Sequence, residues 1–156
     1  MFHRYTLSLC LFLAATISTA AARDLAVVSN KSNSLSAITL PDLVKVCKGQ
    51  TGHWADGKSV TFVMRNPSAP EMKFFLEKVY ELPEAQVKEL IASANHGRMG
   101  HPAVMIVDSD EDLDNKVASI PGAVGIVDVY AINSSVAVVK LGGKLPLEPG
   151  YPLHGN

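Results

Sequence analysis

The sequence predicts a layered α/β domain with a mostly parallel sheet of about five strands and about four helices. Three observations support this fold class. Short apolar runs typical of buried strands alternate with segments whose apolar residues recur at helical spacing. Helix-capping residues, glycines and prolines separate these segments. The 156 residues are 47% hydrophobic and 19% charged, which suits one globular domain with a buried core rather than a disordered chain.

The apolar runs and capping signals place the elements. Strands are expected at 25–29, 60–64, 103–107, 124–127 and 136–141. Helices are expected after a Thr39 cap, after a Ser68 cap, from Pro83, and after a Ser109 cap. Residues 30–37 are polar and predict a loop. Cys47 shares the apolar face of the first helix, so it is predicted to be a buried core residue.

The first 22 residues have the pattern of a secretory signal peptide, which leaves a single domain at 23–156. Arg4 precedes an apolar run that ends in the small residues 20–22. The alternative is an uncleaved membrane anchor, because the run is nearly long enough to span a bilayer. We therefore expect a periplasmic or secreted protein that contacts the membrane only through this segment. Its removal leaves Cys47 alone, so no intrachain disulfide is expected.

The charge balance limits the possible partners. The chain has 14 Lys and Arg residues against 15 Asp and Glu residues, for a formal net charge of −1. General nucleic-acid binding needs a basic surface that replaces the counterions of phosphate, so nucleic acid is not an expected partner.

Two clusters resemble metal sites but lack essential ligands. The acidic run at 108–114 would place Leu113 where a calcium loop needs glycine and Ser119 where it needs glutamate. We interpret it as a solvated helix start. His96 and His101 share a loop and could begin a zinc site, yet no third ligand stands near them. No metal or cofactor is therefore expected.

The segment 60–80 holds the best binding candidate. The chain has no G-x-S-x-G elbow and no catalytic-cysteine signature, so no enzymatic activity is expected. Arg65 ends a predicted strand, and Ser68 begins the next helix. Ligands gather at strand ends in open α/β sheets, and arginine binds phosphate or carboxylate in a fork. The alternative is that Arg65 pairs with a nearby carboxylate. Pro70 donates no N–H there, and Glu71 would repel an anion.

Three stretches carry a family resemblance over residues 24–153. They are LAVVSNKSNSLSAITLPDLVKVCKGQTGHWADGKSVTFVMR, the strand motif IPGAVGIVD, and the closing VAVVKLGGKLPLEPGYPL. In order and spacing they resemble the periplasmic phosphate-binding proteins of ABC importers, especially the short single-lobe members. The resemblance implies one lobe of a type II periplasmic-binding-protein fold, a twisted sheet with helices on both faces. It also implies inorganic phosphate or a similar oxyanion as ligand.

The resemblance points to particular ligand-binding residues. In the family an arginine and a following Ser-Gly-Thr at a helix start hold the anion. Arg65 matches the arginine, whereas Ala69-Pro70-Glu71 stands in place of Ser-Gly-Thr. Ser68 would substitute after a one-residue shift, with Asn66 as a neighbour.

Two functions follow as alternatives. The first is oxyanion binding linked to phosphate transport, with an ABC transporter or another envelope protein as partner. One lobe cannot enclose phosphate alone, so weak affinity is expected unless a partner or a second copy supplies the other wall. The second is a single-lobe module that binds an envelope protein and no ligand.

Overall fold

The computed structural model describes residues 23–155, and the predicted signal peptide at 1–22 lies outside them. Its centre is a six-stranded sheet of strand order β2-β6-β1-β5-β3-β4. In chain order the strands are β1 (Leu25–Ser29), β2 (Ala37–Ile38), β3 (Thr61–Arg65), β4 (Val104–Val107), β5 (Ala123–Asp128) and β6 (Ala137–Leu141). The five predicted strands are confirmed. The short edge strand β2 lies inside the stretch predicted to be a loop.

The sheet is mixed, and three of its five strand pairings are parallel. β1 runs antiparallel to both of its neighbours, β5 and β6. β2 is parallel to β6, and β3 is parallel to β4 and β5. Five of the six described strands therefore point the same way, and β1 is reversed. The alternation of strands and helices predicts the five but holds no signal for the reversal of the first.

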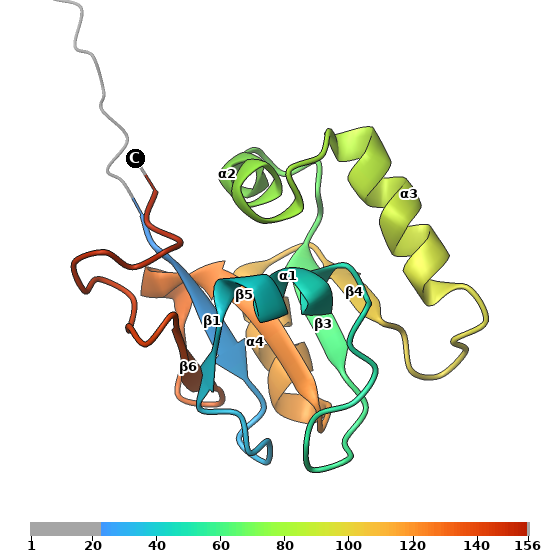
Figure 1. The fold of residues 1–156 in the computed structure, drawn as a ribbon, viewed down its shortest axis with the longest axis horizontal. Coiled ribbons are helices and arrows are strands. Elements are labelled where there is room, and N and C mark those ends of the chain that lie inside the picture. The colour runs from blue at the N-terminus through green and yellow to red at the C-terminus, as the bar shows by residue number, and fades with distance from the viewer. Residues whose placement is uncertain (1–22, 156) are drawn as a thin grey trace, which may run out of the picture.

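Helices cover both faces of the sheet (Figure 1). One face carries α1 (Leu40–Cys47), a segment of three short turns named η1 (Pro70–Met72), α2 (Lys73–Phe75) and η2 (Leu76–Tyr80), and α3 (Glu84–Asn95). The other face carries α4 (Asp110–Ser119). The side chain of Val27 enters the first core, whereas its neighbours Ala26 and Val28 enter the second, because successive side chains of a strand point to opposite faces.

Two of the three predicted side-chain caps are confirmed. Thr39 Oγ1 accepts the backbone N–H of Asp42, and Ser109 Oγ accepts that of Asp112. The third prediction is wrong, because Ala69 occupies the N-cap of η1 with no side-chain cap. Pro70 at the next position preorganises the helical turn without such a cap.

The core reading of Cys47 is confirmed. Its side chain is fully buried, and this burial raises the pKa of the thiol well above its usual value. The backbone carbonyl of Cys47 accepts a 2.7 Å hydrogen bond from the hydroxyl of Tyr80, which is also buried. This bond joins η2 to the end of α1.

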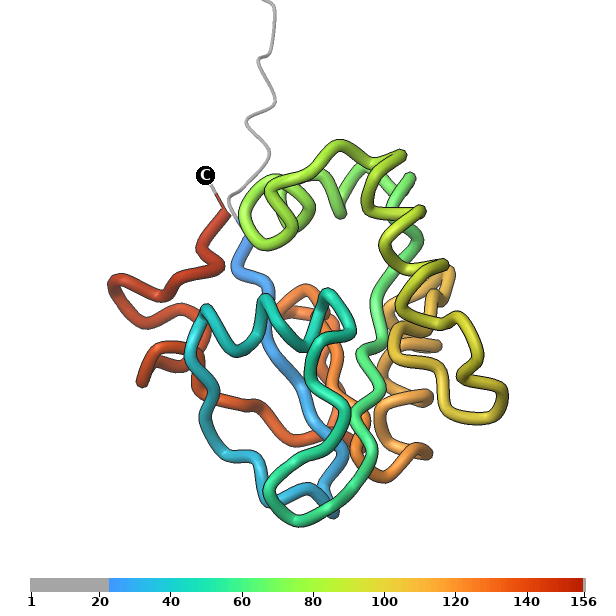
Figure 2. Tube along the Cα trace, turned by 45° about the vertical axis from the view of Figure 1, so that its right-hand side comes forward, coloured from blue at the N-terminus to red at the C-terminus, as the bar shows by residue number. Residues whose placement is uncertain are grey.

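The C-terminal tail lies along the start of β1, so the two ends of the described chain are side by side (Figure 2). The N–H of Leu25 donates to the carbonyl of Leu153, and the hydroxyl of Tyr151 donates to the carbonyl of Leu25. One carboxylate oxygen of buried Asp24 meets the ring of His154, and the other accepts the N–H of Leu147. The tail thus forms part of the edge of the sheet at which β1 begins.

Asp114 on α4 supplies a pH-dependent term in stability. The residue is fully buried, and its Oδ1 has no hydrogen-bond partner among the described residues. Its Oδ2 accepts the N–H of Asn133. Burial raises the pKa of the Asp114 carboxyl, and the charge of Asp110 adds to the rise. The native state therefore binds more protons than the unfolded state above the ordinary carboxyl pKa, so stability falls as the pH increases through this window.

We expect Asp114→Asn to remove this loss of stability. At pH 7 the variant should gain on the order of 1 kcal/mol in free energy of unfolding, the scale of a buried polar group without a partner. Near pH 4 the difference from the native protein should be smaller. Urea denaturation at both pH values measures this difference in free energy of unfolding. An equal or larger gain at pH 4 would contradict the role of ionised Asp114.

Candidate functional site

Several elements end at the same edge of the sheet and form a cavity there. β3 ends at Arg65, β5 ends at Asp128, the reversed β1 begins at Leu25, and α4 begins at Asp110. Between this edge and the segment η1–α2 lies a cavity of about 740 Å³. Ligands of open α/β sheets commonly bind beyond the carboxyl ends of the strands, so this is the first candidate site.

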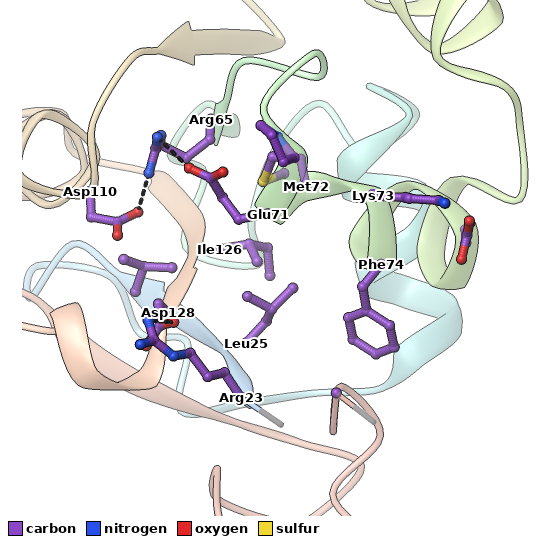
Figure 3. A pocket seen from close by; sticks show the side chains of 14 residues that line it. Arg23, Leu25, Arg65, Glu71, Met72, Lys73, Phe74, Asp110, Ile126 and Asp128 are labelled. Atoms are coloured by element: carbon purple, nitrogen blue, oxygen red, sulfur yellow. Dashed lines mark hydrogen bonds and ion pairs between the residues drawn. The ribbon is translucent and has the colours of Figure 1, made fainter. Parts of the chain in front are cut away.

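Arg65 lies between two carboxylates (Figure 3). Its Nη1 is 2.9 Å from Oδ1 of Asp110, and its Nη2 is 2.7 Å from Oε1 of Glu71. Its Nε is buried and has no hydrogen-bond partner among residues 23–155. The structure therefore bears out the expected alternative in which Arg65 pairs with nearby carboxylates, and it places the guanidinium at the cavity.

The two carboxylates differ in their exposure. The side chain of Arg65 is 16% exposed, that of Asp110 is 32% exposed and that of Glu71 is 55% exposed. Exposed ion pairs typically contribute about 0.2–1 kcal/mol, so the contact with Glu71 costs little to break. Asp110 lies deeper, as the first residue of a helix whose positive N-terminal dipole favours its charge. The contact with Glu71 is thus the more easily broken of the two.

Apolar residues lie between the charged groups of the cavity. Leu25 and Ile126 are placed between the Arg65 cluster and the ring of Phe74 (Figure 3). At the end of the cavity next to the start of β1, Nη1 of Arg23 is 3.2 Å from the carboxylate of Asp128. The site therefore combines the Arg65 cluster and the Arg23–Asp128 ion pair with an apolar surface.

Ser68 lies in a different cluster from Arg65. Its hydroxyl donates to Oε1 of Glu84 at 2.7 Å and accepts a hydrogen bond from Nζ of Lys88 at 2.8 Å. The hydrogen bonds from Lys88 and Ser68 lower the pKa of Glu84. Ser68 lines a separate hollow of about 380 Å³ that does not include Arg65. The structure thus does not bring these two predicted residues together in one cavity.

Asn66 shapes the loop between them. Its Oδ1 accepts the N–H of Ser68, a turn typical of asparagine. Its own N–H donates to the carbonyl of Val107, and its carbonyl accepts the N–H of Ala69. These bonds fix the course of the chain from β3 to η1.

The other candidate clusters hold no assembled site. Residues 23–155 contain no group of three His, Cys, Asp or Glu side chains placed to bind a metal. His96 and His101 are both exposed. The acidic run forms the first turn of α4, as predicted, but sequence reasoning missed that Asp110 pairs with Arg65. The available signal was topological, because the end of β4 adjoins that of β3 when the two strands are parallel.

The sequence of the chain matches no known protein in the two sequence comparisons, whereas its structure matches several solved structures. Neither a protein-family model nor a curated protein matches. Solved phosphate-binding proteins of ABC transporters do match in structure, and the chain has the α/β fold of about one lobe of these proteins. No helix among residues 23–155 is long and apolar enough to cross a membrane.

Three of these structures illustrate the match. An ABC-type phosphate transport receptor from Vibrio cholerae has a TM-score of 0.69 at 19% identity, over 86% of this chain and 54% of that one. PstS from Borrelia burgdorferi has 0.66 at 14%, over 86% and 55%. A putative phosphate ABC transporter substrate-binding protein from Clostridium perfringens, with bound phosphate, has 0.60 at 18%, over 78% and 46%. The chain thus spans about half the length of these relatives.

Proposed function

We propose that this protein is a non-catalytic, single-lobe binding domain of the cell envelope that takes an oxyanion at Arg65. Phosphate is the first ligand to test, because the structurally similar proteins are phosphate receptors and one of them holds phosphate. The observation that carries the proposal is the position of Arg65: its guanidinium faces a cavity at the strand ends and already binds a displaceable carboxylate there.

The geometry also indicates a weak site. An incoming phosphate gains a charge-assisted hydrogen bond to Arg65 but must displace Glu71. Asp110 stays beside the guanidinium and lowers the net positive charge that the anion meets. Contact of the anion with Ser68 or Asn66 stays a prediction, and for Ser68 it requires the hydroxyl to leave Glu84.

Calorimetric titration with phosphate tests the proposal, with Arg65→Ala as the binding variant. We expect saturable binding by the native protein and its loss in the variant, because Arg23, the other arginine that lines the cavity, is paired with Asp128. Arg98→Ala is the matched control, since Arg98 lies in an exposed loop and lines a different hollow. A flat titration of the folded native protein would exclude phosphate as the ligand. Equal binding by Arg65→Ala would exclude Arg65 as the binding residue.

The second candidate is an interaction module without a small ligand. The same ion pairs favour it, because they hold α4 and η1 against the end of β3 and this structural role needs no ligand. Under this alternative Arg65→Ala lowers the free energy of unfolding while anions change neither the melting temperature nor the heat of titration. Transport through an ABC importer belongs to the first candidate, and capture by an envelope protein belongs to the second.

A further inference from the structure

We propose that the cavity beside Arg65 takes an organic carboxylate with an apolar body. The carboxylate head binds the guanidinium in place of Glu71, and the body lies on Leu25, Ile126 and Phe74. This inference rests on the proposed function, since it names the class of oxyanion that the same site takes.

The size of the cavity is the first argument. Its volume of about 740 Å³ falls within the range of about 300–1,000 Å³ that is usual for organic ligands. Inorganic phosphate would fill a small part of this space. A desolvated phosphate also needs hydrogen bonds to nearly all of its oxygens. Of the two guanidinium groups that line the cavity, that of Arg65 is shared by two carboxylates and that of Arg23 is paired with Asp128.

The second argument is the chemical group that the guanidinium of Arg65 already binds. The side chain that binds Nη2 is a carboxylate, that of Glu71, at 2.7 Å. An external carboxylate in its place keeps the same charge on the guanidinium and the same hydrogen-bond chemistry. It carries a single negative charge, so it meets less repulsion from nearby Asp110 than a phosphate dianion does.

The apolar surface is the third argument. Next to the ion pairs, Ile126 is 1% exposed, whereas Leu25 and Phe74 are partly exposed and border the cavity. These apolar side chains have no donors with which to hydrogen-bond an inorganic anion. Each methylene that an organic ligand buries against them improves affinity by about fourfold. The ion pair of Arg23 with Asp128 lies at another border of the cavity.

Titration of the purified protein with four probes tests the inference. Octanoate carries the head and the body, acetate the head alone, octanol the body alone, and phosphate the inorganic charge. We expect octanoate to bind at least about tenfold more tightly than acetate or octanol. Methyl chemical shifts of Leu25 and Ile126 should change with octanoate and stay constant with acetate.

Two variants separate the head from the body. Phe74→Ala should weaken octanoate on the order of tenfold and leave acetate and phosphate unchanged. Arg65→Ala should remove the preference for octanoate over octanol. Arg98→Ala is again the matched control and should bind like the native protein. Phe74 is only partly buried, so its truncation keeps the fold and the test does not depend on the Arg65 variant.

The outcomes distinguish this inference from the proposed function. Binding of octanoate alone supports the inference and excludes phosphate as the ligand. Binding of phosphate without a preference for octanoate overturns the inference and leaves the proposed function in place. Equal binding of octanol and octanoate overturns the inference because the head is not recognised. No binding of any anion overturns both.

Discussion

Gly122→Ala is expected to lower the free energy of unfolding by at least about 3 kcal/mol. Gly122 precedes β5 and has a φ of +89°, which side-chain-bearing residues rarely adopt. A Cβ there would lie 2.0 Å from the backbone oxygen of Ser59. Its carbonyl also accepts a 2.7 Å bond from the indole of Trp54, and its N–H donates to Asn33. Backbone strain and overpacking therefore act together with the loss of these contacts.

Gly57→Ala is the matched control for this variant. Gly57 has a φ of +86°, and a Cβ at that position would meet nothing within 4 Å. It therefore reports the cost of the backbone conformation alone, about 1–3 kcal/mol. Urea denaturation of both variants isolates the steric term as their difference. Equal destabilisation would show that the contact with Ser59 relaxes without cost.

Glu71→Gln is expected to tighten phosphate binding on the order of tenfold. The substitution removes the carboxylate that occupies Nη2 of Arg65, so the anion no longer competes with it. The loss in stability should stay below about 1 kcal/mol, because Glu71 is more than half exposed. Titration calorimetry with phosphate measures the gain.

Glu77→Gln shows whether this gain is specific to the ion pair. Glu77 lines the same cavity and carries the same charge, but it makes no ion pair with Arg65. We expect it to improve phosphate binding only slightly, through the general loss of negative charge. If the two variants bind phosphate equally well, displacement of Glu71 does not limit binding.

Much of the fold was predictable because its signals are local. The Thr39 and Ser109 caps lie next to the helices that they begin, and the apolar runs mark the core strands. The reversal of β1 and the edge strand β2 were not predictable in this way. Both depend on pairing with β6, more than a hundred residues further along the chain. The segment predicted to be one helix after Ser68 divides into 3₁₀, α and π turns.

The candidate site was predictable only in part. Arg65 follows a strand, which places it at the ligand-binding edge of an α/β sheet. Ser68 has the right type and position in sequence, but the packing of α3 brings Glu84 and Lys88 to its hydroxyl. Leu25 belongs to a predicted core strand, and Phe74 carries no signal in the sequence that sets it apart. Their place in the cavity follows from tertiary packing, which no short-range pattern records.

The pairing of β1 has a consequence for how the protein is made. β1 is the first strand of the domain, yet both of its neighbours, β5 and β6, come from the last part of the chain. The carbonyl of Leu25 also accepts a hydrogen bond from the hydroxyl of Tyr151, which lies 126 residues further along the chain. Pairings at such separation form slowly, because the intervening loop must close first. A nascent chain therefore cannot complete its sheet until β5 and β6 have both emerged from the ribosome.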